Sequence, residues 1–157
     1  MPLFARMMFG LVNFAARRGL AAEPSGSSAD AKQRARRTGV RGETYAYWYL
    51  RRHGYILVAR NYTAAGSKGE IDLVGYDGLV LAFVEVKTRT GAPGDFGLPE
   101  DAVTPEKRRS LARMARHFLA EWRIREATCR FDVLAIESRP GQRPAVRLHK
   151  GAFVADA

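Results

Sequence analysis

Cysteine is almost absent from this sequence, and histidine is scarce. Cys129 is the single cysteine, so the chain cannot form an internal disulfide or a zinc site built from several thiolates. The three histidines, at positions 53, 117 and 149, lie far apart and show no metal-ligand spacing. We therefore expect a protein of a reducing compartment, the cytoplasm.

Long hydrophobic runs are also missing. No apolar stretch approaches the roughly 20 residues that cross a bilayer. Hydrophobic residues make up 46% of the chain and charged residues 27%, which is ordinary for a soluble globular protein. The 157 residues suffice for one compact core.

Acidic residues are outnumbered, with 16 Asp and Glu against 26 Lys and Arg and a formal net charge of +10. Such an excess favours a polyanionic partner such as nucleic acid. Residues 1–37 carry half of this excess, with seven basic and two acidic side chains, so the rest is only moderately basic. We interpret 1–37 as a basic, flexible extension and linker, with a targeting signal as the weaker alternative, and expect the domain over 38–157.

The first half of that domain predicts a helix and three strands. Thr38 can cap a helix whose inward stripe includes Glu43. Residues 55–62 have the composition of a strand. Two further strands meet around Asp77-Gly78, a dipeptide suited to a tight hairpin turn.

The second half predicts another helix and one or two strands. Thr104 is placed to cap a helix with Pro105 in its first position, followed by apolar residues at helical spacing. Residues 129–138 and 144–153 are the remaining strand candidates. This order predicts an α/β sandwich with a mixed central sheet.

Charged side chains gather on one face of the predicted hairpin. A turn centred on Asp77-Gly78 would place Glu70 opposite Glu85, and alternation along each strand would then align four ionisable groups, unless a bulge intervenes. These groups are Glu70, Asp72, Glu85 and Lys87.

Crowded carboxylates repel one another unless a positive charge lies between them. Oxygen ligands without histidine or thiolate favour Mg²⁺ or Mn²⁺ over zinc. Such an ion polarises a phosphate oxygen and activates water, while Lys87 could orient that water or offset charge. Glu43 could add a metal or water contact, or could be an acid stabilised by the helix dipole.

Basic residues follow at the start of the second helix. Lys107 shares the stripe of the apolar residues near the helix N-terminus, where phosphate is favoured. Arg109 and Arg113 fall on another face that could follow a nucleic-acid backbone, although a basic helix face is most often only solvated. Arg89 could reach a phosphate or be an ordinary surface residue.

Other polar and aromatic residues have structural interpretations. We expect Asp132 to pair with an arginine rather than a metal. We expect Cys129 to be a small core residue. The aromatic residues of 45–49 are expected to pack in the core rather than stack on bases.

The motifs together resemble a known family. "GEIDLV", followed thirteen residues after its aspartate by the glutamate of "FVEVKTR", resembles the PD-(D/E)xK nuclease superfamily. With "GETYAYWYLRRHGY", "ARNY", "VTPEKRRSL" and "RFDVLAI", the chain over about 38–137 resembles the YraN-like family of predicted endonucleases, related to archaeal Holliday junction resolvases.

The resemblance implies a restriction endonuclease-like three-layer sandwich that hydrolyses DNA phosphodiesters with Mg²⁺. It implies Asp72 and Glu85 as metal ligands, Lys87 as the catalytic lysine and Glu43 as the helix acid, with less settled roles for Glu70 and Lys107. Resolvase-like relatives act as dimers on branched DNA, so the resemblance makes a homodimer a candidate assembly, although the sequence shows no dedicated interface signal. Residues 1–37 have no counterpart in the family pattern.

Two other classes of function stay open at the level of sequence. One is a nucleic-acid-binding module that keeps the nuclease scaffold without turnover, within a DNA-processing complex. The other is a scaffolding protein whose basic leader contacts RNA, the ribosome or an anionic membrane surface.

Overall fold

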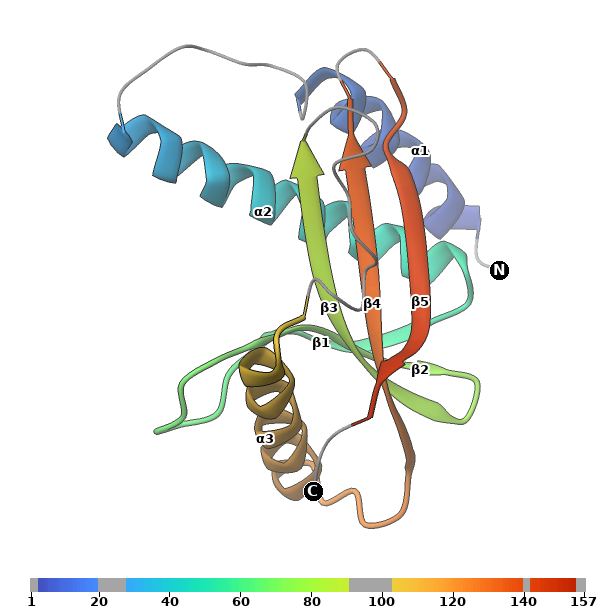
Figure 1. Ribbon diagram of the computed structural model, residues 1–157. Helices are drawn as coiled ribbons and strands as arrows, with labels where there is room; N and C mark the ends of the chain where they lie inside the picture. The colour runs from blue at the N-terminus through green and yellow to red at the C-terminus, as the bar shows by residue number, and fades with distance from the viewer. Residues whose placement is uncertain (1–2, 20–27, 91–102, 140–141, 155–157) are drawn as a thin grey trace.

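Five strands form one mixed sheet in the order β1-β2-β3-β4-β5 (Figure 1). They are β1 Ile56–Tyr62, β2 Ile71–Asp77, β3 Val80–Thr90, β4 Thr128–Ser138 and β5 Ala145–Phe153. The β3 and β4 strands are parallel, and the other neighbours are antiparallel. The computed structural model describes residues 3–19, 28–90, 103–139 and 142–154.

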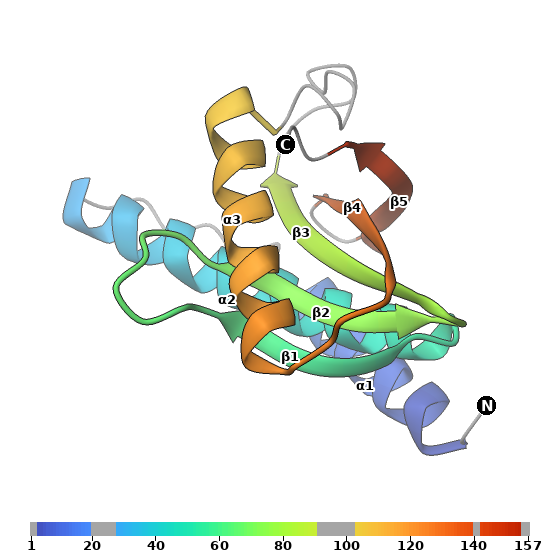
Figure 2. The same cartoon turned by 90° about the horizontal axis from the view of Figure 1, so that it is seen from below.

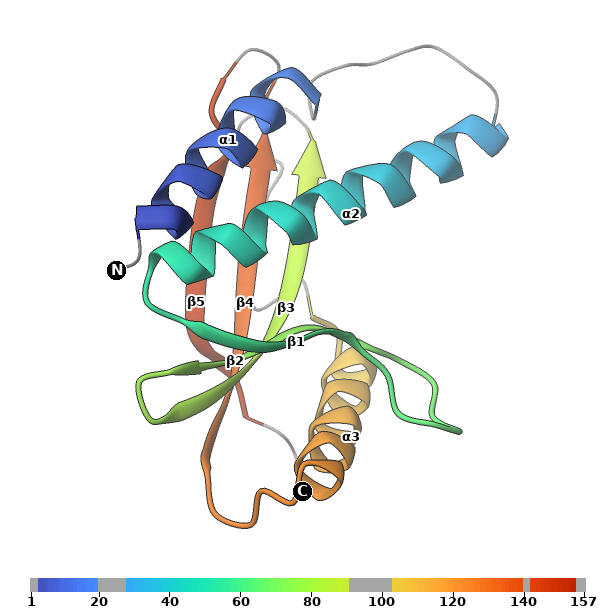
Figure 3. The ribbon, with the colours of Figure 1, turned by 180° about the vertical axis from the view of Figure 1, so that it is seen from behind.

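Three helices cover the two faces of this sheet. Helices α1 (Leu3–Gly19) and α2 (Ser28–Arg52) lie on one face, as Figure 3 shows from their side. Helix α3 (Pro105–Glu121) lies on the opposite face (Figure 2). The predicted α/β class is confirmed, and the arrangement is compatible with a restriction endonuclease-like sandwich.

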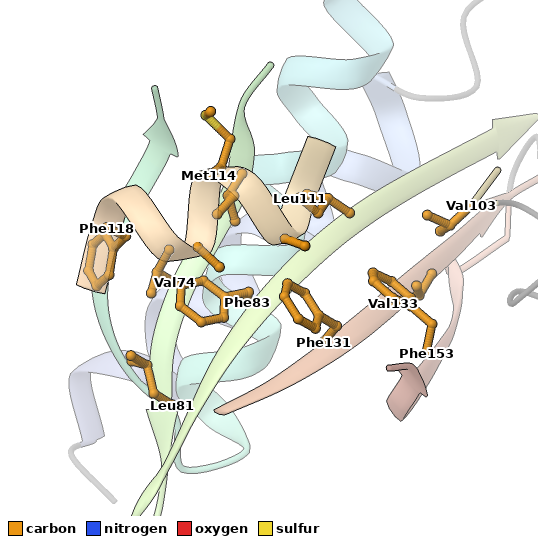
Figure 4. Close-up of a cluster of buried hydrophobic side chains, with 13 residues drawn as sticks. Val74, Leu81, Phe83, Val103, Leu111, Met114, Phe118, Phe131, Val133 and Phe153 are labelled. Carbon is orange, nitrogen blue, oxygen red and sulfur yellow. The ribbon is translucent and has the colours of Figure 1, made fainter. Parts of the chain in front are cut away.

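The core beneath α3 forms as the sequence predicts. Thr104 caps the helix by accepting a hydrogen bond at Oγ1 from the Lys107 backbone N–H at 3.2 Å, and Pro105 occupies the first helical position. The face of α3 that carries Met114 and Phe118 is buried against Phe83 and its neighbours on the strands (Figure 4). This packing fixes the start of α3 over the middle of the sheet.

The β2–β3 hairpin turns one residue later than predicted. Asp77 pairs with Val80, so Gly78 and Leu79 form the two-residue loop, and Val74 faces Phe83. Gly78 has a φ of +63°, and glycine at the first of two turn positions is what one of the favoured hairpin turns requires. The predicted pairs are therefore wrong by two residues. Because two is the side-chain period, the residues from Leu73 to Val84 keep their predicted faces. Ile71 does not, because it packs in the cluster under α3 whereas Leu73 packs in the cluster under α2.

Helix α2 begins at Ser28 rather than at the predicted Thr38. The segment 29–37 reads ADAKQRARR, in which alanine, lysine, glutamine and arginine are strong helix formers, and its helix propensity outweighs its resemblance to a linker. The helix runs through residue 37. The assignment of 38–157 as a separate nuclease-like domain stays a prediction.

Helix α1 packs on α2 through aromatic contacts. The Phe9 ring is buried, and its centroid lies 5.4 Å from that of Tyr45 and 6.0 Å from that of Tyr49. The predicted core role of the 45–49 aromatics is confirmed, because they line this second hydrophobic cluster. Among the described helices, none is long and apolar enough to span a membrane.

Asp132 is the centre of a buried polar network. Arg130 donates to its two oxygens, from Nε to Oδ1 at 2.7 Å and from Nη2 to Oδ2 at 3.0 Å, which confirms the predicted arginine partner. Tyr55 Oη and the Gly151 backbone N–H also donate to this carboxylate, at 3.3 and 2.9 Å. Asp132 has no exposed surface, so its charge is compensated only by these donors.

The same arginine links the network to the hairpin turn. Its Nη2 lies 2.7 Å from Asp77 Oδ2, which Lys150 also contacts at 2.6 Å. Hydrogen bonds from Lys150 and Arg130 lower the pKa of Asp77. Cys129, expected in the core, is instead exposed near the start of β4, where burial begins only at Phe131.

Asp132→Ala should lower the free energy of unfolding by about 3 kcal/mol or more, because it leaves Arg130 partly buried without its main partner. Urea denaturation measures this loss. Asp77→Ala is the matched control, and its half-exposed carboxylate should contribute about 1 kcal/mol or less. Equal losses in the two variants would contradict a special role for the buried carboxylate.

Candidate functional site

Glu85 lies on β3, on the face that α3 covers, and is 4% exposed. Two lysines approach its carboxylate: Lys87 Nζ lies 2.8 Å from Oε1, and Lys107 Nζ lies 3.1 Å from Oε2. Lys87 is two residues along the same strand, and Lys107 comes from the first turn of α3. The Thr104 cap fixes the start of α3 and thus places the positive charge of Lys107 beside Glu85.

The second oxygen of Glu85 is incompletely satisfied. Oε2 is buried and accepts no hydrogen bond, because Lys107 approaches it at ion-pair distance without the geometry of a donor. A buried carboxylate oxygen that lacks a hydrogen-bond donor costs free energy. This oxygen is suited to an additional cationic or hydrogen-bonding ligand.

Asp72 lies on β2, on the same face of the hairpin. Regular pairing of β2 with β3 ends at Leu73 and Val84, so Asp72 lies one residue beyond the last pair, as Glu85 does on β3. Its Oδ2 accepts a hydrogen bond from the Val86 backbone N–H at 2.6 Å. The hairpin register that differs from the predicted one therefore brings the two carboxylates closer than the sequence indicated.

Burial and the charge of Glu85 raise the pKa of Asp72 to about 7. The Val86 N–H and Lys107 act in the opposite direction, and the more distant charge of Glu43 adds to the rise. Asp72 thus holds its negative charge against repulsion from a neighbouring carboxylate, which is the situation that a bound cation relieves.

Glu43 approaches this group from α2. Its Oε2 accepts a hydrogen bond from Asn61 Nδ2 on β1 at 2.8 Å. The preceding residue, Gly42, sets the distance between α2 and the sheet, because a Cβ at that position would lie 1.9 Å from Thr88 Oγ1 on β3. Glycine inside a helix costs about 1 kcal/mol relative to alanine. Here it permits a close approach that a larger residue would prevent.

Asn61 and Gly42 were not among the predicted site residues. Asn61 has a φ of +48°, in the left-handed region that asparagine adopts more readily than most residues. An asparagine at the end of a predicted strand and a glycine within a predicted helix were the available signals. Neither identifies a contact with Glu43 or Thr88 without the three-dimensional arrangement.

The remaining predicted residues lie around this centre. Glu70 is exposed, one residue before β2, and the structure does not bring it into the buried group. Arg109 and Arg113 are exposed on α3, where Arg113 Nη2 donates to the Lys68 carbonyl at 3.1 Å. Arg89 is exposed near the end of β3.

The donor set fits a hard divalent cation in its chemistry. Asp72 and Glu85 offer adjacent buried carboxylates, Glu43 is near enough to affect the pKa of Asp72, and one oxygen of Glu85 lacks a donor. As the side chains stand, no three Asp, Glu, His or Cys within the described residues converge as metal ligands. The two lysines occupy the surroundings of Glu85, so metal binding requires them to shift.

A family model and individual relatives of this chain indicate the same protein family. A family model described as "Uncharacterised protein family UPF0102" matches residues 42–136. A UPF0102 protein of Koribacter versatilis is 43% identical over 119 residues, which cover 75% of this chain and 80% of that protein. A UPF0102 protein of Symbiobacterium thermophilum is 46% identical over 118 residues, 75% of this chain and 97% of that protein.

A third relative, from Geobacter metallireducens, is 44% identical over 115 residues, 73% of this chain and 90% of that protein. The chain belongs to the UPF0102 family. This is the YraN-like family of predicted endonucleases that the motifs indicated, so that resemblance is confirmed. The UPF0102 match contains Glu43, Asp72, Glu85, Lys87 and Lys107, whereas α1 lies outside it.

The link between Asn61 and Glu43 predicts a measurable coupling. In a double-mutant cycle of Asn61→Ala and Glu43→Ala, the two losses of unfolding free energy should overlap by about 0.5–1 kcal/mol, because either change removes the same hydrogen bond. Asn61→Gly, which keeps the positive φ, separates backbone strain from that bond. Strictly additive losses would show that the contact contributes nothing.

The pKa of Asp72 predicts a pH-dependent stability. Its ordinary value is 3.8, so between about pH 4 and 7 the folded state binds a proton that the unfolded state has released, and stability falls as pH rises. In the presence of a chelator, Asp72→Asn should raise the free energy of unfolding at pH 8 by roughly 1–3 kcal/mol.

The advantage of Asp72→Asn should shrink from pH 7 towards pH 4, as urea denaturation at several pH values would show. Glu106→Gln, which removes an exposed acid from the first turn of α3, is the control with no such trend. An advantage that does not change with pH would contradict the raised pKa.

Proposed function

We propose that this UPF0102 protein is a nucleic-acid-binding, Mg²⁺- or Mn²⁺-dependent nuclease that hydrolyses DNA phosphodiester bonds. The observation that carries the proposal is the pair of buried carboxylates, Asp72 and Glu85, which lie close together on neighbouring strands with two lysines beside Glu85. A merely structural charge pair would not need a second buried carboxylate whose pKa is raised by burial and by the charge of the first.

Each residue of the site has a proposed part in the reaction. Asp72 and Glu85 would hold the divalent ion, with Glu43 as a further ligand or a contact to water; Glu70 stays a candidate ligand. When bound, such an ion supplies polarisation of a phosphate oxygen and a lowered pKa for its water. Lys87 would release Glu85 and orient the attacking water or offset the charge that develops on phosphorus.

Lys107 has a separate proposed part as a phosphate contact. It lies in the first turn of α3, where exposed backbone N–H groups and the helix dipole favour anions. The exposed Arg109, Arg113 and Arg89 would contact the nucleic-acid backbone beyond the cleaved bond. The net charge of +10 supports such an electrostatic contribution to binding.

The family resemblance extends the proposal to structured or branched DNA and to a homodimer. Two symmetric strands of a junction would need two copies of the site. The cytoplasm stays the predicted location.

Cleavage assays with purified protein test the proposal. Branched, duplex and single-stranded DNA are incubated with Mg²⁺ or Mn²⁺ under single-turnover conditions. We expect metal-dependent cleavage that falls at least about 100-fold in Asp72→Asn, Glu85→Gln and Lys87→Ala, as expected when metal or charge stabilisation is lost. Glu106→Gln, the nearby exposed acid, should cleave like the unaltered protein.

The results separate activity from contamination. Cleavage that persists in both Asp72→Asn and Glu85→Gln would contradict the assignment. Unfolding curves for each variant establish that a loss of cleavage does not result from a loss of fold.

One observation favours a second candidate, a catalytically silent binding module. The two lysines already pair with the oxygens of Glu85, a neutralised arrangement that needs no metal. This candidate predicts nucleic-acid affinity that decreases steeply with salt, without cleavage by any metal. Binding measured alongside the cleavage assay distinguishes the two.

A further inference from the structure

Helix α1 presents two apolar faces, one packed on α2 and one more than half exposed, from which Phe4 contacts Trp48 of α2 with ring centroids 6.0 Å apart. On the inner face, Phe9 packs against α2, Val12 lines the same cluster, and Asn13 Oδ1 accepts a hydrogen bond from Tyr45 Oη at 3.3 Å. The guanidinium of Arg52 lies 5.0 Å from the centre of the Phe9 ring. These contacts hold α1 as a helix on the surface of α2.

The outer face of α1 is an exposed apolar stripe. Its members recur at helical spacing and are 57%, 64%, 60% and 53% exposed. They are Phe4, Met7, Leu11 and Phe14. Single exposed apolar residues are common, but four aligned on one helix mark an interaction surface. We call these four residues the outer stripe.

The charge of the α1 sequence indicates the partner. Helix α1 contains three arginines and no acidic residue, and residues 1–37 hold seven basic and two acidic residues. An amphipathic helix that combines aromatic and aliphatic residues with basic ones is typical of peptides that lie in the surface of an anionic bilayer. A second copy of this chain would bring like charges together, so charge disfavours it as the occupant.

The position of α1 leaves the candidate nuclease site accessible. Helix α1 and helix α3 lie on opposite faces of the sheet (Figure 2). Asp72, Glu85 and Lys107 lie on the α3 side. A protein bound to a membrane through α1 would therefore present its carboxylates and its exposed α3 arginines away from the lipid.

We propose that α1 is an interfacial helix that binds anionic phospholipid, with the outer stripe inserted at the boundary between headgroups and acyl chains. Apolar burial supplies the affinity, and the arginines of α1 supply the preference for negative charge. This function does not depend on nuclease activity.

Sedimentation of the full chain with vesicles tests the proposal. The probes are vesicles of phosphatidylcholine alone and of equimolar phosphatidylcholine and phosphatidylglycerol. We expect binding to the anionic vesicles and little to the neutral ones. Leu11→Gln should lower the partition coefficient roughly tenfold, since one leucine no longer enters the apolar layer.

Leu79→Gln is the matched control, because it removes another exposed leucine, 93% exposed, at the β2–β3 turn. It should bind anionic vesicles like the unaltered chain. Both positions are exposed, so circular dichroism should show the same fold in each variant.

Three results would overturn the proposal. The first is the absence of binding to anionic vesicles. The second is binding that Leu11→Gln leaves unchanged, which would assign it to charge alone. The third is concentration-dependent dimerisation that Leu11→Gln abolishes while vesicle binding is absent, which would assign the outer stripe to a second copy of the chain.

Discussion

The proximity of Asp72 and Glu85 imposes the electrostatic constraint on which the candidate site depends. Two carboxylates on neighbouring strands are buried, and burial together with the charge of Glu85 disfavours the charged form of Asp72. Such an arrangement lowers stability unless positive charge is supplied nearby. Lys87 and Lys107 supply part of it, and a divalent cation would supply the rest.

The surrounding elements of the fold determine where these charged groups lie. The hairpin brings the two acids together, the Thr104 cap places Lys107 beside Glu85, and Gly42 lets α2 approach β3. On the neighbouring strand β4, where Asp132 pairs with Val84, the network is built differently, because both oxygens of Asp132 have donors. The contrast separates a satisfied structural network from a candidate site that retains an unsatisfied oxygen.

Much of the site could be predicted from local patterns. Alternation along two strands predicts that Asp72, Glu85 and Lys87 share one face, and a shift of the pairing by two residues does not change this. The Thr104-Pro105 cap predicts where α3 begins and hence that Lys107 lies in its first turn. The predicted turn was wrong by one residue because Asp77-Gly78 is a strong hairpin signal. In the structure the loop is Gly78-Leu79, and Gly78 adopts a positive φ at the first loop position. The observed register places Asp72 and Glu85 each one residue beyond the last pair of the hairpin, close enough for the charge of Glu85 to affect Asp72.

The features that escaped prediction depend on contacts between distant segments. Asn61 meets Glu43 across eighteen positions of sequence, and the close approach of Gly42 to Thr88 depends on the angle of α2. The start of α2 was misjudged because small and polar residues suggested a linker while their helix propensity was high. The outer stripe of α1 also follows from tertiary structure, since the contact with α2 determines which apolar face stays exposed.

The titration of the Asp72 carboxyl is the most direct test of the proposed metal site. Carbon-13 NMR of the full chain, with the signal assigned by its loss in Asp72→Asn, follows this group as pH changes. We expect a midpoint near pH 7 without divalent metal, because the carboxyl is buried beside Glu85, and a clear fall when Mg²⁺ is added. A midpoint near the ordinary value of 3.8 that Mg²⁺ does not move would contradict it.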